Sequence, residues 1–351
     1  MIFIQIIGRG RRDPVGRCAK RMASQRGVAL IIALILVALA TILASKLTFD
    51  GFLERRRAIG VLAAEQALHF GMGAEALAAD VLVRDGQNTK QTTLAAPWAQ
   101  PTQPLPITPQ DDPEGEPIGT LQGELEDMQG RFNLNSLAHV VNVAEGNLQK
   151  PTQDPQPLAQ FQRLLASVGV EPKWAGIARD WIDADDIPGS PDGAEDQIYT
   201  SQTPPYRTGN WPMLSPSELM NLPGFGADRY RKIAPYVTAL PTAVPYVNVC
   251  TASAPVLESL LESLTDNSGE YTPEVLAAGR KTGCFPEVTA LTNILGSKLP
   301  HTQPSIIGDD SHYFRLTTRV TLGTTEFTLY SLLLRGGGGK ITPLLRSFGT
   351  P

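Results

Sequence analysis

The most chemically distinctive stretch of the chain is the acidic segment, residues 180–206. It contains seven carboxylates and no Lys, Arg or His. The carboxylates are those of Asp180, Asp183, Asp185, Asp186, Asp192, Glu195 and Asp196. Like charges at this density repel one another unless the segment is unfolded or a cation neutralises it. The segment therefore predicts either a solvated acidic loop or a site for a hard cation.

The ligand atoms of the acidic segment favour one kind of cation. Its side chains offer oxygen and no His nitrogen or Cys sulfur. Ca²⁺ takes about six to eight oxygens in irregular geometry, which suits a loop containing Gly and Pro better than Mg²⁺ would. The spacing is not that of an EF-hand, since Asp183-x-Asp185 is followed by Pro188 at the sixth position and Ala194 at the twelfth. A glycosidase-like pair of carboxylates would need a cleft and one raised pKa, and the sequence indicates neither.

A second motif resembles a nucleic-acid binder. Residues 221–233, NLPGFGADRYRKI, have the form of a helix-hairpin-helix, whose backbone amides contact phosphates in DNA-binding proteins. DNA binding needs several cations that neutralise phosphates, but only Arg229, Arg231 and Lys232 lie near the hairpin. The net charge of −5 also argues against a general nucleic-acid binder. We expect this helix pair to pack within the protein as part of its scaffold and not to bind DNA.

The remaining candidate motifs carry no catalytic chemistry. The run RGGGGKIT has Leu334 where a phosphate loop needs its first Gly and Ile341 where it needs Ser or Thr, so it predicts a hairpin turn. No nucleophile motif such as Gly-x-Ser-x-Gly occurs. The four histidines are scattered: His69, His139, His301 and His312. We predict that the protein is not an enzyme.

Three cysteines occur, and one of them lies apart from the others. Cys18 is in the basic N-terminal head, which leaves Cys250 and Cys284 as a pair. If the chain after residue 45 leaves the cytoplasm, this pair predicts a disulfide; two buried free thiols are the alternative.

An apolar run near the start of the chain indicates on which side of a membrane the residues after it lie. Val28 to Ser45 are eighteen residues without a charge, preceded by seven Lys or Arg and a single Asp. Such a run spans about 27 Å as a helix, roughly the thickness of a bilayer core. The upstream basic residues keep the N-terminus cytoplasmic and send the rest of the chain outward.

Three interpretations compete for this start. A secretory signal would be cut near Ala38-Leu39-Ala40, a twin-arginine signal would use Arg11-Arg12, and a prepilin-type leader would be cut after Gly27. The run continues into an amphipathic stretch whose apolar residues recur at spacings of three and four. They are Leu53, Ile59, Leu62, Ala63, Ala67, Phe70, Ala74 and Leu77. A signal peptide does not need this continuation, so we predict one helix over about residues 28–83 that stays in the membrane.

The remaining elements alternate between strand and helix. Residues 84–117 are polar and Pro-rich and predict a loop, and 118–134 predict strands. From 158 to 298, short helical patterns broken by Pro and Gly predict a compact all-α module. After residue 310 the pattern alternates again, with a turn at 336–339. Strands on both sides of a helical block predict that the block is inserted into one α/β domain.

Together these features resemble the type II secretion minor pseudopilins of the K type, the GspK family. The resemblance rests on the apolar helix with its amphipathic continuation and on five segments. These are GELEDMQGRFNLNSL (123–137), DWIDADD (180–186), GAEDQIY (193–199), LSPSELMNLPGF (214–225) and YVNVCTASAPVL (246–257). The resemblance covers nearly all of the chain after Gly27, while the head before Gly27 is longer than is usual in that family.

The resemblance implies an α+β fold in five parts. Residues 1–27 are then a prepilin-type leader, and 28–48 are the transmembrane half of a long helix. Residues 49–150 begin a pilin-like domain with an antiparallel sheet, and 301–351 supply its C-terminal strands. An all-α domain with helix-hairpin-helix-like segments and the acidic loop, residues 151–300, is inserted between them.

The resemblance also implies roles for individual residues. Gly27 is then the residue at which prepilin peptidase cuts, and Val28 the new, methylated N-terminus. Pilins carry Glu at the fifth position after the cut, where this chain has Ile32. Family members bind Ca²⁺ through a loop of this kind, and the implied ligands are Asp183, Asp185, Asp192, Glu195 and Asp196, with Asp180 and Asp186 as outer-shell candidates.

As a function, the resemblance implies a structural subunit of the type II protein secretion system. The protein would join the I- and J-type minor pseudopilins, then the H type, at the tip of the periplasmic pseudopilus, and would initiate and cap that filament. Its other expected partners are the major pseudopilin, the prepilin peptidase, the inner-membrane platform and inner-membrane lipid, with no nucleic acid. The expected location is the bacterial inner membrane, in a single pass with most of the chain periplasmic. The alternative is a membrane-anchored helix-hairpin-helix DNA receptor of a competence-type uptake system.

Overall fold

The computed structural model divides the chain into two compact units, Met1–Leu62 and Ala63–Pro351. It describes residues 26–109, 111–112, 114–145, 148–189, 191–243, 246–260, 280, 283–284 and 307–349. One helix, α1 (Arg26–Asn88), begins in the first unit and ends in the second. All described strands belong to the second unit.

Helix α1 confirms the predicted long helix and extends it by a few residues. In the first unit every side chain from Val28 to Ile59 is exposed, including the whole apolar run. Among the described residues, one helix is long and apolar enough to cross a membrane, Val28–Asn88. The first unit therefore has the form of a single-pass membrane anchor.

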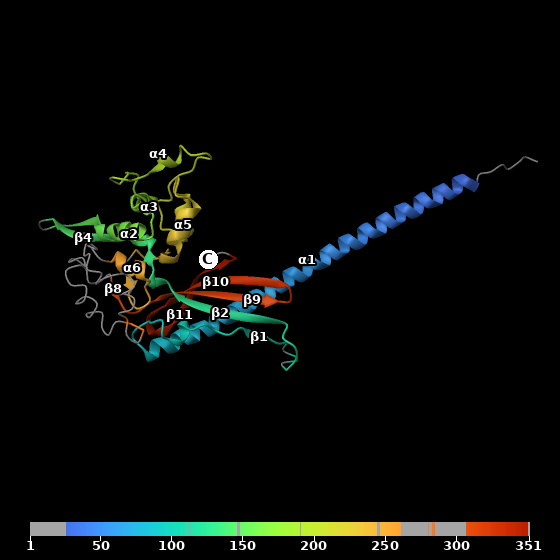
Figure 1. Cartoon of the computed structure of the whole chain (residues 1–351), viewed down its shortest axis with the longest axis horizontal. Coiled ribbons are helices and arrows are strands. Elements are labelled where there is room, and N and C mark those ends of the chain that lie inside the picture. Colours follow the sequence, from blue (N-terminus) through green and yellow to red (C-terminus); the bar gives the residue numbers. More distant parts are fainter. Residues whose placement is uncertain are drawn as a thin grey trace, which may run out of the picture. The chain divides into compact units, whose positions relative to one another are not determined.

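The second unit contains a five-stranded antiparallel sheet in the order β1-β2-β9-β10-β11 (Figure 1). The strands are β1 (Leu105–Ile107), β2 (Gly119–Asp127), β9 (Tyr313–Leu322), β10 (Thr325–Arg335) and β11 (Ile341–Phe348). The turn predicted at 336–339 lies between β10 and β11 and includes the 3₁₀ helix η8 (Gly337–Gly339). Strand β1 lies in the stretch predicted as loop; its Pro106 is tolerated because β1 is at the edge of the sheet.

The second half of α1 packs on this sheet. Its buried side chains are mostly small: Ala67, Ala74, Ala78 and Leu82. Small side chains allow close approach, and at Gly71 an added Cβ would lie 3.0 Å from a methyl carbon of Leu329. The core between helix and sheet is completed by Phe314, Leu316, Val320 and Leu333. Buried Glu75 on α1 joins the two layers by accepting hydrogen bonds of 2.7 and 2.8 Å from Arg346 of β11.

A mainly helical module is inserted between two neighbouring strands of the sheet. Strands β2 and β9 pair directly, with Asp127 opposite Phe314, yet residues 128–312 lie between them in sequence. The helices described in this module are α2 (Pro155–Ser167), α3 (Trp174–Ile182), α4 (Asp196–Tyr199), α5 (Gly226–Ile233) and α6 (Ala254–Ser259). The 3₁₀ helices in its described residues are η2 (Met128–Gly130), η3 (Leu134–Ala138), η4 (Pro216–Asn221) and η5 (Ala234–Tyr236), while η1 (Pro97–Ala99) precedes β1. An insertion into the sheet domain is as predicted, and the narrower bounds expected for its all-α part, 151–300, stay a prediction.

The described part of the module also contains three two-stranded pairings that the sequence did not predict, although β3 lies within 118–134, the stretch predicted as strands. They are the β4–β5 hairpin (Val140–Glu145 with Leu148–Gln153) and the parallel pairs β3–β6 (Phe132–Asn133 with Val237–Thr238) and β7–β8 (Val247–Asn248 with Ile307–Gly308). The helical patterns at 273–281 and 286–295 lie outside the described residues, apart from Arg280.

Aromatic side chains and a disulfide hold the core of the module. Phe132 stacks on Phe161 of α2 with ring centroids 5.0 Å apart, and both rings are fully buried. Cys250 and Cys284 are buried and form the predicted disulfide. This core carries the acidic segment on α3 and in the loop that follows it.

Candidate functional site

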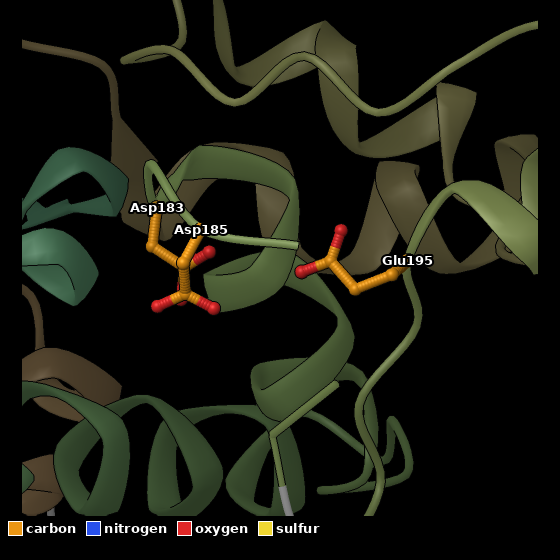
Figure 2. A group of neighbouring side chains, drawn as sticks. All are labelled: Asp183, Asp185 and Glu195. Carbon is orange, nitrogen blue, oxygen red and sulfur yellow. The ribbon is translucent and has the colours of Figure 1, made fainter. Parts of the chain in front are cut away.

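Three carboxylates of the acidic segment converge at the end of α3 (Figure 2). One ligand oxygen from each of Asp183, Asp185 and Glu195 can be chosen such that all three lie within 4.8 Å of one another. In Figure 2, Asp183 and Asp185 lie together on one side and the carboxylate of Glu195 points toward them from the other. We call these three residues the acid cluster.

Two helix ends position the acid cluster. Asp183 is the residue at which α3 stops, with an extended backbone (φ −70°, ψ 166°) that turns the chain out of the helix. Glu195 precedes the first turn of α4 and is also extended (φ −118°, ψ −175°). Beneath the loop between them, Tyr199 is fully buried and lies against Trp181, with ring centroids 5.3 Å apart. The aromatic layer therefore supports the loop that brings Glu195 back to the end of α3.

Asp180 closes this loop from within and is not a member of the acid cluster. Its Oδ2 accepts hydrogen bonds from the backbone amides of Gly189 and Ala194, at 2.8 and 2.9 Å. The backbone is so close at this point that a Cβ on Gly193 would overlap both the Asp180 carboxylate and the Gly189 backbone. The glycine at 193 is thus required by the loop, and a Cβ on Gly189 would lie 2.8 Å from Oδ1 of Asp180.

The acid cluster is only partly compensated by the described part of the chain, where Asp185 accepts a hydrogen bond from the amide of Ile187 at 2.9 Å. Both carboxylate oxygens of Glu195 and Oδ1 of Asp183 are buried without a hydrogen-bond partner there. Oδ2 of Asp183 accepts one hydrogen bond, from Gln153 at 2.9 Å. Buried carboxylate oxygens without donors are rare in proteins because each one loses its hydration. A bound cation would supply the missing interaction.

The electrostatic environment of the cluster also opposes ionisation in the absence of a cation. Burial, together with the neighbouring acids, raises the pKa of Glu195 from 4.5 to about 7. Burial raises the pKa of Asp183 from 3.8 to about 6, and the charges of Asp180 and Asp185 contribute to that shift. Burial raises the pKa of Asp180 as well. A divalent cation would reverse these shifts, because it favours the ionised carboxylates.

The other predicted ligands lie elsewhere. Asp192 is exposed and outside the acid cluster. Asp196 accepts hydrogen bonds from the amide and hydroxyl of Thr208, at 3.1 and 3.0 Å, and its other oxygen lies 3.4 Å from Arg207. Asp186 accepts a hydrogen bond from Asn210. The structure thus brings together three of the five predicted ligands, all oxygen donors suited to a hard cation such as Ca²⁺.

The basic residues of the helix-hairpin-helix segment are already engaged within the protein. Arg229 makes a bidentate pair with Glu171, at 2.7 and 2.8 Å. Arg231 pairs with Asp228 at 2.6 Å, and Lys232 donates to the carbonyl of Gly169. Two of these contacts join α5 to the loop between α2 and α3 and the third lies within α5, and the DNA-receptor alternative is not supported.

The residues assigned to leader processing lie at the start of α1. Arg26 and Gly27 are its first residues, and Val28 and Ile32 follow with exposed side chains. A long helix, apolar at its start and amphipathic where it packs on an antiparallel sheet, defines the pilin class of proteins. The inserted module and its acid cluster distinguish this chain within that class.

Comparison with known proteins identifies the family. The family model for the type II secretion system (T2SS), protein K, matches residues 130–242. A type II secretion system protein K from Pseudomonas aeruginosa is 36% identical over 336 residues, which are 93% of this chain and 93% of that protein. A protein K from Aeromonas hydrophila is 32% identical over 335 residues, covering 93% of this chain and 97% of that protein. The chain belongs to the type II secretion system protein K family.

A solved structure agrees with this assignment. A chain in the crystal structure of the GspK-GspI-GspJ complex from the type 2 secretion system of enterotoxigenic Escherichia coli is similar to this one, with a TM-score of 0.70 and 25% sequence identity. The match covers 84% of this chain and 100% of that chain. The pilin-like fold with an inserted module is therefore shared with a minor pseudopilin of known structure.

Proposed function

We propose that this protein starts and caps the periplasmic pseudopilus as a member of a minor-pseudopilin tip complex. The similar chain of known structure was solved together with GspI and GspJ. By analogy, we assign the I- and J-type minor pseudopilins as immediate partners, followed by the H type and the major pseudopilin. Export of folded proteins across the outer membrane would then depend on the filament that this complex starts.

The observation that carries this proposal is the position of the inserted module. It occupies residues 128–312 between two paired strands of a pilin-like sheet, so it adds bulk to every filament position that the subunit could occupy. A filament shaft of small pilins would be crowded by this bulk, whereas the membrane-distal end has nothing above it. Ile32 also supports a position at the membrane-distal end. A carboxylate at that position would recruit a charged N-terminus inside the bilayer, and Ile offers none.

The remaining assignments concern processing and location. We propose that Gly27 is the cleavage residue of a leader formed by residues 1–27, that Val28 becomes the methylated N-terminus, and that residues 28–48 cross the inner membrane. The N-terminus is then cytoplasmic and the second unit periplasmic. The prepilin peptidase and the inner-membrane platform would act on the chain before it enters the filament.

We further propose that the acid cluster holds a structural Ca²⁺ ion through Asp183, Asp185 and Glu195. The unpaired buried oxygens of Asp183 and Glu195 support this assignment, as does the absence of nitrogen and sulfur ligands in the cluster. When bound, the ion supplies the positive charge that lets these carboxylates remain ionised. Asp180 acts beside them by holding the loop closed through its two backbone hydrogen bonds. The ion would stabilise the outer part of the module and would catalyse no reaction.

The tip position can be tested by imaging. A small electron-dense label is attached to an exposed side chain of the module, such as Trp211→Cys, and assembled pseudopili are viewed by electron microscopy. Label at one end of each filament is the expected result. A label on the major pseudopilin, as control, should decorate the whole shaft. Regular spacing of the module label along the shaft would exclude the cap.

A matched pair of variants tests the role of Ile32 in this position. Ile32→Glu restores the carboxylate that the chain lacks, and Ile32→Leu keeps the side chain apolar. If the missing carboxylate helps to confine the subunit to the end, the Glu variant should show some label within the shaft and the Leu variant none.

A further inference from the structure

A second charged region follows the apolar run, and the function proposed above does not use it. Residues 46–57 contain four basic side chains, Lys46, Arg55, Arg56 and Arg57, and two acidic ones, Asp50 and Glu54, for a net charge of +2. All lie in α1 and are exposed. Within the described part of the chain, none of the three arginines forms an ion pair. We call residues 46–57 the collar.

The collar lies where the helix would leave the bilayer. About 20 helical residues cross a bilayer core, so a span that starts at Val28 ends near Leu47. Phe49 and Phe52 follow within the next two turns and are 62% and 53% exposed. Large exposed apolar side chains are unfavourable in water, so both rings extend the apolar surface of the helix a few residues beyond Leu47. The rings therefore mark the level at which the hydrocarbon core meets the headgroups.

The arginine side chains can reach back toward that level. Side chains on a helix lean toward its N-terminus, and here the N-terminus points to the membrane. The guanidinium carbon of Arg56 lies 5.1 Å from the ring centroid of Phe52, one turn nearer to the bilayer than its own Cα. With this lean, guanidinium groups attached about 12–15 Å beyond Leu47 come within roughly one Debye length of the phosphates.

The arrangement of the arginines favours lipid over a protein partner. Successive residues of a helix project about 100° apart, so Arg55, Arg56 and Arg57 leave α1 on three different sides. A partner helix contacts a single stripe, with charges at spacings of three and four. A layer of headgroups instead surrounds the helix and meets all three guanidinium groups at once.

Leader removal changes the balance of charge across the membrane. In the uncut chain, seven Lys or Arg residues flank the cytoplasmic end of the apolar run, and all seven precede Val28. A cut after Gly27 would remove every one of them, leaving the collar as the only cluster of basic side chains beside the span. We propose that residues 46–57 bind anionic phospholipid headgroups on the periplasmic face of the inner membrane and hold the processed subunit there before assembly.

This inference rests on the membrane topology proposed above, and the test separates the two. The processed chain, residues 28–351, is reconstituted in mixed vesicles of phosphatidylglycerol and phosphatidylcholine, with the acyl chains of one lipid brominated at a time. Leu43→Trp, in the last turns of the apolar run, reports which lipid surrounds the helix through quenching by bromine. The same chain without this substitution supplies the background of its four native Trp residues.

The expected result is stronger quenching by brominated phosphatidylglycerol, corresponding to a preference of about threefold or more, which high salt reduces. Substituting Arg55, Arg56 and Arg57 together by Gln should reduce this preference to near one. The matched control, Asp50→Asn with Glu54→Gln, removes the two acids from the same turns and should increase it.

Each contrary result has its own meaning. Two results would refute lipid binding by the collar: equal quenching of the introduced indole by both lipids, or a preference that survives in the triple Gln variant. The three arginines would then be expected to bind a protein partner. No quenching by either lipid shows that the apolar run does not cross the bilayer and overturns the topology with it. Helix content from circular dichroism confirms that the variants keep α1.

Discussion

The free energy of unfolding of the cation-free second unit, residues 63–351, should fall as the pH rises through the range in which the acid cluster ionises. Folding raises the pKa of Glu195 from 4.5 to about 7 and that of Asp183 from 3.8 to about 6. The folded state therefore holds these two protons more tightly than the unfolded state does. For Glu195 the resulting stabilisation is complete below pH 4.5 and is lost by about pH 7.

The size of this effect follows from the pKa shifts. Each titrating group changes the free energy of unfolding by about 1.4 kcal/mol per pH unit between its two pKa values. Glu195 alone would then lose roughly 3–4 kcal/mol, which corresponds to a fall in melting temperature on the order of 10 °C for a unit of this size. Ca²⁺ at about 100 times its Kd would restore about 2.7 kcal/mol and would act mainly at high pH, where no protons compete for the ligands.

Melting curves at pH 5 and pH 8, each with Ca²⁺ or with a chelator, measure these effects. Glu195→Gln removes the buried charge, so it should raise the melting temperature in chelator at pH 8 and abolish the response to Ca²⁺. Asp192→Asn is the matched control, because Asp192 belongs to the same segment but is exposed and outside the acid cluster. It should change neither quantity.

Two results would refute the assignment of a cation to these residues. One is a melting temperature at pH 8 that is the same in chelator and in Ca²⁺. The other is a Glu195→Gln variant that responds to Ca²⁺ as fully as the unmodified chain.

Four further outcomes are expected. Gly27→Val should leave the precursor at full length in the inner membrane on immunoblots, whereas N-terminal sequencing of a mature protein that starts well inside the apolar run would contradict the leader. Reducing the Cys250–Cys284 disulfide, whose cysteines are 34 residues apart, should lower the free energy of unfolding by about 3–4 kcal/mol in denaturant titrations. Phe161→Ala should cost about 3–5 kcal/mol in the same assay, because it empties a fully buried ring site, and Phe348→Ala at an exposed position should cost under about 1 kcal/mol. The second unit should show no salt-dependent retention on duplex DNA, and a clear salt slope would revive the DNA-receptor alternative.

Those elements that have a local pattern could be predicted from the sequence. The apolar run and the amphipathic stripe after it predicted α1, and alternation after residue 310 predicted the C-terminal strands. The short strands β6, β7 and β8 have two residues each, too few for any periodicity, and each depends on a partner far away in the sequence. Strand β3 is equally short but falls within 118–134, the stretch predicted as strands. The β4–β5 hairpin did have a signal, since Gly146-Asn147 separates two strand-like runs. Pro151 inside the second run obscured it.

The candidate site was only partly predictable for a related reason. Composition indicated that the acidic segment is either a solvated loop or a site for a hard cation. Composition could not show which acids face one another, because that depends on how the loop closes between α3 and α4. The loop closes on Asp180, which the sequence indicated only as an outer-shell candidate for the cation site. The backbone approaches itself closely at Gly189 and Gly193, and these two glycines were the sequence signal that could have located the closure of the loop.

The placement of the inserted module between β2 and β9 also bears on how the protein reaches its native state. These two strands form one ladder, but the chain must first traverse residues 128–312 before the second of them is available. Closing so long an unstructured loop is entropically unfavourable and slow. A module that has already folded, by contrast, presents residues 127 and 313 side by side and turns a distant pairing into a local one. The central strands of the sheet should therefore join late, after the module, so that a subunit with a misfolded module would have no completed sheet to offer to a growing filament.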